Sequence, residues 1–267
     1  MSDANKGTAL VTGASSGIGA IYADRLARRG YDLILVARSQ DKLSQLATRL
    51  GKETGRKVET VAADLNHGDD LRRVETVLRT NDRITLLINN AGFGSSSPLL
   101  SSDVDKMEEM ISINVRALMR LTYAAVPGFV ARGGGTIINI SSIAGVAPEI
   151  LNGVYGGTKA FVLAFSQSLH KELAEKNIRV QAVLPGATAT EFWDVAGTPV
   201  SHLPSAIVMK ADAMVDAALA GLDQGELVTI PALPEIGDWQ AYETARQKMM
   251  PNLSRSAPAA RYGQSAA

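Results

Sequence analysis

The sequence contains no cysteine in its 267 residues. Disulfide bonds, thiolate catalysis, thiolate zinc sites and iron–sulfur clusters are therefore excluded. Histidine is scarce, with scattered residues at positions 67, 170 and 202, so we expect no metal site. Basic and acidic side chains number 27 each, and this balance argues against a broad nucleic-acid or acidic-membrane footprint.

Long apolar runs are also missing. No stretch approaches the roughly 20 residues of a membrane span, and the polar opening segment MSDANKG is too short for a signal peptide. We therefore expect a soluble, cytoplasmic protein without nucleic-acid or membrane partners. Hydrophobic residues still make up 46% of the sequence, which is ample for the core of one large α/β domain or two small ones.

Short apolar runs recur along the chain, with helical patterns between them. Strands are expected at 8–12, 32–37, 57–62, 85–89, 135–141, 178–184 and 226–230. Helices are expected at 17–29, 40–52, 69–80, 104–131, 154–176 and 211–223. This alternation predicts one doubly wound, Rossmann-like α/β domain with about seven parallel strands and helices on both faces. The domain is expected to span residues 1–250, and the proline- and alanine-rich residues 251–267 are expected to form a loosely ordered tail.

The first expected strand runs into a glycine-rich turn, Gly-x-x-x-Gly-x-Gly, that opens a helix. Glycine permits a tight turn and close approach of a diphosphate, and the helix N-terminus presents free N–H groups to that anion. No Gly-Lys-Ser/Thr sequence is present, so the turn is not a P-loop. The alternative is a turn required only for packing. The residues expected to bind the cofactor here are Gly13, Ser15, Ser16, Gly17, Ile18 and Gly19.

At the end of the second expected strand, an NAD-binding protein would carry a carboxylate that grips the adenosine ribose. The sequence at 36–39 is instead Val-Ala-Arg-Ser, with no acidic residue. The guanidinium of Arg38 offers a fork suited to a 2′-phosphate, and Ser15 or Ser39 can add hydroxyl donors. The pattern favours NADP(H) over NAD(H), with a solvated surface arginine as the alternative.

Ser142, Tyr155 and Lys159 form a candidate catalytic set. Tyr155 and Lys159 are four residues apart, so their side chains share one face if the segment after Asn152 is helical. A phenol ordinarily ionises near pH 10, and a nearby ammonium favours the phenolate; a shift of roughly 3 pKa units needs about 4 kcal/mol. Ser142 could then hydrogen-bond the substrate oxygen that exchanges its proton with Tyr155. The alternative is an ordinary amphipathic helix with an exposed lysine.

Taken together, these motifs resemble those of the short-chain dehydrogenase/reductase family, in its single-domain branch of roughly 250 residues. The resemblance covers about residues 6–231 and rests on the loop TGASSGIG, on Asn-Asn-Ala-Gly at 89–92 and on the serine, tyrosine and lysine set. Family members commonly carry Ala-Ser before the lysine, whereas Gly157 and Thr158 stand here. Gly156 and Gly157 each cost helix stability, about 1 kcal/mol relative to alanine.

The resemblance implies further site residues. Asp64 and Leu65 would meet the adenine, and Asn114 would hold a water in a proton relay that connects Lys159 to solvent. Asp64 could instead cap its turn, and Asn114 could be a satisfied core amide. The remaining residues implied to contact the cofactor are Asn90, Ala91, Gly92, Pro185, Gly186, Thr188 and Thr190.

The implied reaction is hydride transfer between a nicotinamide and a carbonyl or alcohol carbon. In the reducing direction Tyr155 would donate a proton to the substrate oxygen, and Ser142 would orient that oxygen. Lys159 would lower the pKa of Tyr155 and, by resemblance, bind the ribose hydroxyls beside the nicotinamide.

In this family the segment after the sixth strand, here about 190–210, closes over the substrate. It carries few charges, which suits a hydrophobic carbonyl compound, although its aromatic residues could instead pack against their own core. Its apolar residues are Phe192, Trp193, Val195, Leu203, Ile207, Val208 and Met209, and Phe93 and Ile143 are further candidates for the pocket.

Two other functional classes stay open. One is a cofactor-binding redox sensor or scaffold without turnover, and the other is an S-adenosylmethionine methyltransferase, which also uses a glycine-rich first turn. The resemblance further suggests a homodimer or homotetramer formed through the helices near 104–131 and 154–176. Their apolar faces are equally consistent with core packing.

Overall fold

The structure is a computed structural model in which residues 6–263 are described. The chain divides into two compact units, Met1–Pro231 and Ala232–Ala267. The first unit ends earlier than the domain boundary expected at residue 250. The expected division into a catalytic domain and a loosely ordered tail stays a prediction, and residues 264–267 of that tail lie outside the described residues.

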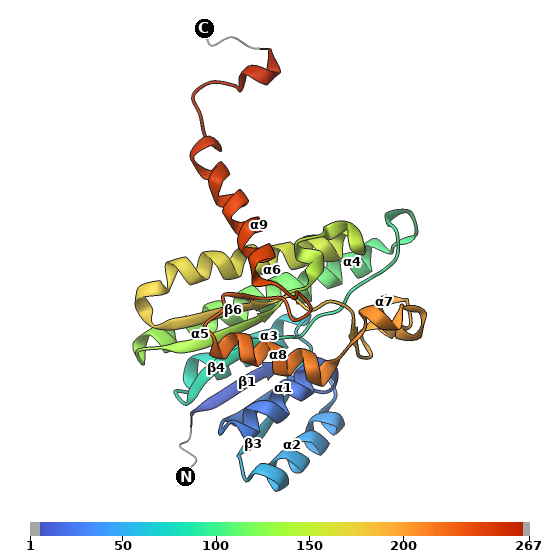
Figure 1. The fold of residues 1–267 in the computed structure, drawn as a ribbon. Helices are drawn as coiled ribbons and strands as arrows, with labels where there is room; N and C mark the ends of the chain where they lie inside the picture. Colours follow the sequence, from blue (N-terminus) through green and yellow to red (C-terminus); the bar gives the residue numbers. More distant parts are fainter. Residues whose placement is uncertain (1–5, 264–267) are drawn as a thin grey trace. The chain divides into compact units, whose positions relative to one another are not determined.

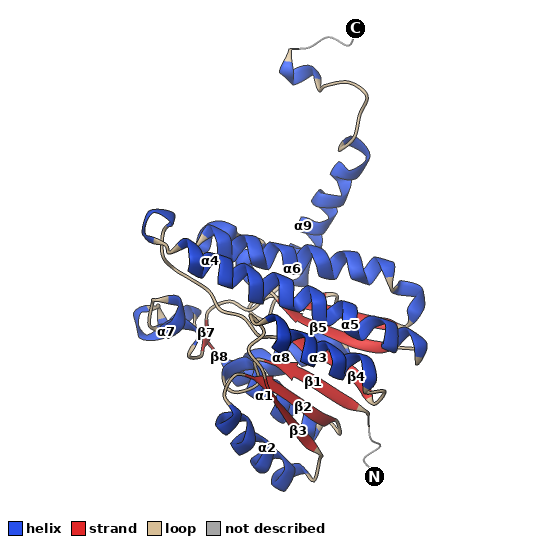
Figure 2. Cartoon of the chain, turned by 180° about the vertical axis from the view of Figure 1, so that it is seen from behind, coloured by secondary structure: helices blue, strands red, loops and turns tan. Residues whose placement is uncertain are grey.

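The first unit is built on a seven-stranded parallel sheet with the order β3-β2-β1-β4-β5-β6-β9. Strands β1 to β5 of this sheet are labelled in Figure 2. Its strands are β1 (Thr8–Thr12), β2 (Asp32–Ala37), β3 (Val58–Ala62), β4 (Ile84–Asn89), β5 (Gly135–Ile140), β6 (Ile178–Val183) and β9 (Val228–Thr229). The strand order reverses between β1 and β4. Ligands of doubly wound sheets bind beyond the carboxyl ends of the strands near such a point.

Helices cover both faces of this sheet (Figure 1). One face is covered by α1 (Gly17–Arg28), α2 (Gln40–Thr54) and α8 (Ala211–Asp223). The other is covered by α3 (Gly68–Thr80), α5 (Leu118–Ala131) and α6 (Gly153–Glu172). The predicted fold class is therefore confirmed.

Because both faces of the sheet are covered, its strands are mostly apolar at successive positions. In β1, Val11 packs into the cluster beneath α1 and α8, whereas its neighbour Leu10 packs into the cluster beneath α3 and α5. Successive side chains of a strand point to opposite faces, and a sheet covered on both faces needs apolar residues at both.

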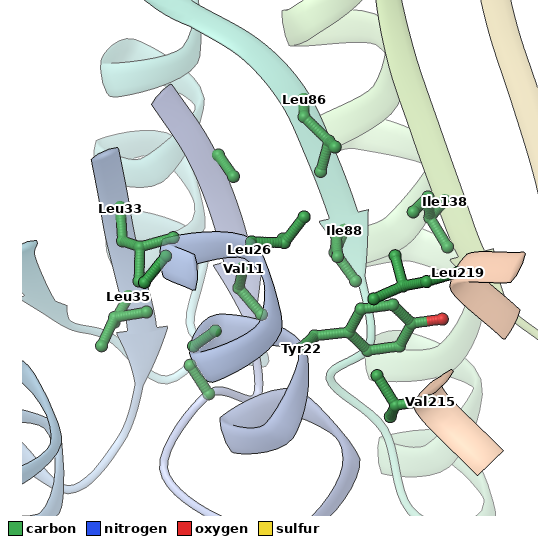
Figure 3. Packing of buried hydrophobic residues seen from close by; sticks show 14 of the residues in the cluster. Val11, Tyr22, Leu26, Leu33, Leu35, Leu86, Ile88, Ile138, Val215 and Leu219 are labelled. Carbon is green, nitrogen blue, oxygen red and sulfur yellow. The ribbon is translucent and has the colours of Figure 1, made fainter. Parts of the chain in front are cut away.

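Tyr22 of α1 lies inside the first of these clusters (Figure 3). Its ring is surrounded by aliphatic side chains that include Ile88, Val215 and Leu219, and it is 0% exposed. Among the described residues its hydroxyl has no hydrogen-bond partner. A polar group buried without a partner destabilises the fold, so Tyr22 is a local weakness in an otherwise apolar core.

The expected helix at 104–131 is not one continuous α-helix. It consists of α4 (Val104–Ile111), a π-helical segment (Ser112–Ala117) and α5, which contains Pro127. Such wide turns are often found at functional sites, and this one carries Asn114.

Four further elements differ from the expected pattern. The segment 190–210 contains the short helix α7 (Phe192–Ala196), and it is flanked by two-residue strands, β7 (Thr188–Ala189) and β8 (Met209–Lys210), which pair in parallel. In the second unit, α9 (Ile236–Met249) was not expected. None of its residues is buried, so the sequence has no apolar face there by which the helix could be recognised.

Candidate active site

The predicted site residues lie where strands of the sheet end and the following loops begin. Gly13 follows β1, Arg38 follows β2, Asp64 follows β3, Asn90 follows β4 and Ser142 follows β5. Because the strands are parallel, these carboxyl ends share one edge of the sheet. The fold therefore brings together residues that are far apart in the sequence.

The glycine loop is fitted closely to the loop after β4. A methyl group on Gly13 would lie 2.7 Å from Nδ2 of Asn90, and one on Gly19 would lie 2.3 Å from the carbonyl oxygen of Gly13. Nδ2 of Asn90 donates to the carbonyl oxygens of Thr12 (2.9 Å) and Gly13 (3.2 Å). Gly13 also has φ +65°, in the region that favours glycine. Packing therefore requires these glycines whether or not a cofactor is bound, and their contact with a cofactor stays a prediction.

The same loop is suited to an anion. Ser16 is the N-cap residue of α1, but its side chain makes no capping hydrogen bond, and the first turn of the helix contains no acidic residue. The N–H groups of the first turn and the positive end of the helix dipole favour a diphosphate at this point. The residues present therefore fit the expected dinucleotide.

Arg38 directly follows β2 and is exposed. Within residues 6–263 its guanidinium makes no ion pair or hydrogen bond. Ala14 of the glycine loop donates its N–H to the carbonyl oxygen of Val36 (3.2 Å), which keeps the loop beside the end of β2. The hydroxyl of Ser39 caps α2 by accepting from the N–H of Lys42 (3.4 Å).

Asp64 and Leu65 have structural roles in the described chain. Oδ1 of Asp64 accepts from the N–H of Asn66 (3.0 Å), which is the turn-capping role named as its alternative. Leu65 is buried in the core cluster beneath α3. Their contact with the adenine stays a prediction.

Ser142, Tyr155 and Lys159 are brought together and are all buried. The hydroxyl of Ser142 accepts from the N–H of Ala144 (3.1 Å). Nζ of Lys159 lies 5.7 Å from the centre of the Tyr155 ring and donates to the carbonyl oxygen of Ile140 (2.9 Å).

The acid–base properties of this set differ from the sequence expectation. Burial raises the pKa of Tyr155 to about 12, and the hydrogen bond with Ser142 offsets this only in part. Burial likewise lowers the pKa of Lys159 to about 8. We expected Lys159 to lower the pKa of Tyr155; in this structure the loss of water around the phenol dominates, because desolvation disfavours the charged form of each group.

Asn114 is held by the loop after β4 and by α6. Its Nδ2 donates to the carbonyl oxygen of Phe93 (2.9 Å) and to the hydroxyl of Thr158 (3.1 Å), and its Oδ1 accepts from the N–H of Phe93 (3.2 Å). A methyl group on Gly92 would lie 2.5 Å from Oδ1 of Asn114 and 3.9 Å from Nζ of Lys159. The amide is therefore satisfied, as its structural alternative held, and it lies close to the lysine. Its part in a proton relay stays a prediction.

The segment after β6 meets the glycine loop. A methyl group on Gly17 would lie 3.3 Å from Cγ2 of Thr190. The carbonyl oxygen of Pro185 accepts from the N–H of Ile143 (3.1 Å), and the Thr188 hydroxyl donates to the carbonyl oxygen of Gly186 (3.0 Å). These contacts hold the segment beside the glycine loop and beside the loop that follows β5.

The aromatic residues of α7 divide between two roles. Trp193 is buried, and its Nε1 donates to the carbonyl oxygen of Thr188 (3.0 Å), so it anchors the helix. Phe192 packs against Tyr155, with ring centres 5.8 Å apart. Val195 and Ile207 are exposed. The expected apolar lid is therefore only partly turned toward the candidate catalytic residues.

Several residues of the site were missed in the sequence. Asn152 caps α6, and its Oδ1 accepts from the N–H groups of Val154 (2.8 Å) and Tyr155 (3.4 Å). An asparagine before an expected helix is a recognisable signal for this role. Gly94 and Ser96 carry no such signal, because their contacts are with residues of α7 and the loop after it.

Two features are not found among residues 6–263. No group of three or more histidine, aspartate or glutamate side chains is arranged to hold a metal ion. No helix of this part of the chain combines the length and the apolar content that crossing a membrane requires.

A family model described as short chain dehydrogenase matches residues 7–199. The chain belongs to the short-chain dehydrogenase/reductase family. The resemblance seen in the sequence is confirmed, and this is a family of oxidoreductases that bind NAD(P)(H).

Curated relatives include the very-long-chain 3-oxoacyl-CoA reductase of Mus musculus, 39% identical over 202 residues. The match covers 74% of this chain and 64% of the relative, so this chain spans less than two thirds of that protein's length.

Two solved structures match over nearly the whole of both chains. A short-chain dehydrogenase from Sphingobium yanoikuyae in complex with NADPH is 50% identical, with a TM-score of 0.92 and coverage of 95% of this chain and 98% of that one. The bulky-bulky ketone specific alcohol dehydrogenase from Comamonas testosteroni is 44% identical, with a TM-score of 0.89 and coverage of 97% and 99%.

Proposed function

We propose that the protein is an NADP(H)-dependent oxidoreductase that transfers a hydride between the nicotinamide and an apolar ketone or the corresponding secondary alcohol. The observation that carries this proposal is the buried set of Ser142, Tyr155 and Lys159 at the carboxyl edge of the sheet. Burying a lysine together with a tyrosine and a serine costs stability, and a structural role alone would not require it.

The bound nicotinamide supplies or accepts the hydride. In reduction Tyr155 gives its hydroxyl proton to the carbonyl oxygen. Ser142 hydrogen-bonds the same oxygen and orients it. Lys159 binds the ribose hydroxyls, and Asn114 connects it to solvent through water.

The preference for NADP(H) is supported by Arg38. An exposed guanidinium without an ion-pair partner in the described chain, beside the anion-binding turn, is suited to bidentate contact with a 2′-phosphate. The 50% identical Sphingobium protein is a complex with NADPH, which is consistent with this assignment.

The test is a fluorescence titration of the protein with NADPH and with NADH. We expect NADPH to bind more tightly, and Arg38→Ala to weaken NADPH binding roughly ten- to a hundredfold while NADH binding is unchanged, since a charge-assisted contact contributes about 1.5–3 kcal/mol. Arg49→Ala, which removes another exposed arginine of the region after β2, is the control. Tighter binding of NADH would refute the assignment of Arg38.

An apolar substrate is supported by the surroundings of Tyr155. Its ring packs with Met110 and Ala144, and the partly buried residues around them are Phe93, Met107, Leu151, Val154 and Phe192. The relative from Comamonas is named for bulky ketones, which accords with such a pocket.

A redox sensor or scaffold without turnover is the second candidate. Tyr155→Phe separates the two, because it removes the proton donor and leaves the cofactor site in place. An enzyme should lose at least a hundredfold in kcat while NADPH still binds. The methyltransferase alternative is set aside by the family to which the chain belongs.

We also propose a homodimer or homotetramer, in the cytoplasm. On the face of α5 and α6 Tyr123 is 68% exposed, and its ring stacks on that of Phe165 with centres 6.4 Å apart. Aromatic residues of this kind are enriched at protein–protein interfaces. Light scattering at micromolar concentration tests the proposal, and a monomer would refute it.

A further inference from the structure

Phe192 lies directly beside the proposed proton donor. Its ring is inclined by 51° to that of Tyr155, with centres 5.8 Å apart, and Tyr155 is only 5% exposed. Both rings rest on the backbone of Gly94: a methyl group there would lie 2.4 Å from Cζ of Phe192 and 3.1 Å from Cε2 of Tyr155. The absence of a side chain at position 94 is what allows Phe192 to approach so closely.

The position of Phe192 is fixed from both ends of α7. At the start of the helix, its ring meets that of Trp193 edge-on, with centres 5.6 Å apart, and Trp193 is itself anchored to Thr188. At the end of the helix, Ser96 donates its N–H (3.0 Å) and its hydroxyl (2.9 Å) to the carbonyl oxygen of Ala196. A side chain held in this way defines the shape of the space next to it.

We propose that Phe192, resting on Gly94, is a specificity-determining residue that limits the size of one of the two substituents on the substrate carbonyl. This inference rests on the proposed ketone reductase activity. A carbonyl oxygen that reaches the Tyr155 hydroxyl places its carbon beside this tyrosine, and the substituent on the Phe192 side meets the phenyl ring. The preferred substrate is therefore an apolar ketone with one large and one small substituent, which differs from the bulky-bulky ketones for which the Comamonas relative is named.

The test compares the reduction of acetophenone, which has one small substituent, with that of 1,2-diphenylethanone, which has two large ones. We divide kcat/KM for 1,2-diphenylethanone by kcat/KM for acetophenone, and we expect Phe192→Ala to raise this ratio at least tenfold. A single group that does not fit an apolar pocket lowers kcat/KM by about tenfold or more. Val195→Ala, in the same helix with a 66% exposed side chain, should leave the ratio unchanged.

Gly94→Ala gives an independent check. Its methyl group displaces Phe192, so we expect kcat/KM to fall for both ketones, and we expect Phe192→Ala in the same chain to restore much of the loss. An unchanged ratio in Phe192→Ala, with wild-type activity on both ketones, would overturn the inference. If the wild-type protein binds NADPH but reduces neither ketone, the proposed function itself fails.

Discussion

The side chain of Asn152 joins the helix that carries Tyr155 to the loop after β4, because its Nδ2 donates to the carbonyl oxygen of Ser97 at 2.7 Å. The same nitrogen donates to the hydroxyl of Ser102 (3.1 Å), while Oδ1 caps the first turn of α6. One 7% exposed amide therefore uses both its donor and its acceptor to hold Tyr155 in register with the loop.

Asn152→Ala should lower the free energy of unfolding by about 1–2 kcal/mol, since it removes a helix cap and two hydrogen bonds to the loop after β4. We also expect kcat to fall more than the affinity for NADPH, because the change displaces Tyr155 rather than the glycine loop. Asn152→Asp keeps the cap and loses only the donor, so its defect should be smaller. Equal effects on kcat and on NADPH affinity would indicate a general structural role.

Gly156 and Gly157 should respond in opposite ways to alanine. A methyl group on Gly156 would lie 2.9 Å from the Cα and the Cβ of Pro148, whereas one on Gly157 would have no neighbour within 4 Å. Gly157→Ala should therefore stabilise the protein by about 1 kcal/mol through helix propensity, and Gly156→Ala should destabilise it. Urea denaturation of the two variants measures both effects, and a similar gain in both would contradict the contact with Pro148.

The buried ammonium of Lys159 should make stability depend on pH. Its pKa falls from 10.5 to about 8 on folding, so between these values the unfolded chain binds more protons and the folded state gains stability as pH rises. The gain should total roughly 3 kcal/mol across this window. Lys159→Met has no such group, so the difference in free energy of unfolding between wild-type and variant protein should change with pH from 8 to 10.5. Parallel curves would contradict the burial of the charge.

Tyr22→Phe should leave stability unchanged or raise it. Burial raises the pKa of the Tyr22 phenol, and the variant removes a hydroxyl that has no partner among the described residues while keeping the ring. An unsatisfied buried hydroxyl costs about 1–3 kcal/mol, part of which the variant recovers. Thermal denaturation without cofactor measures the effect. A clear loss of stability would mean that the hydroxyl is hydrogen-bonded in solution.

The sequence predicted the sheet well because each strand must be apolar on both faces, as Leu10 and Val11 show. It also predicted the candidate site, since Tyr155 and Lys159 are close in the sequence and the glycine loop opens a helix. The direction of the Tyr155 pKa shift was wrong, because it depends on how completely other segments exclude water from the phenol.

Other features could not be predicted because they join distant segments. Ser96 meets Ala196, 100 residues later, and Asn152 meets Ser97 across 55 residues. No local pattern reports such pairs. The contact of Gly94 with Phe192 is of the same kind, since a single glycine in a loop has no periodicity to interpret.

The anchoring of α7 by Trp193 also gives the protein a built-in optical probe. The sequence contains two tryptophans, and the other, Trp239, lies in the second unit. Trp239→Phe would therefore leave an emission spectrum that belongs to Trp193 alone. Movement of α7 that breaks its hydrogen bond to Thr188 should shift this spectrum toward that of hydrated indole. Stopped-flow fluorescence could then show whether this helix moves during turnover, without any attached label.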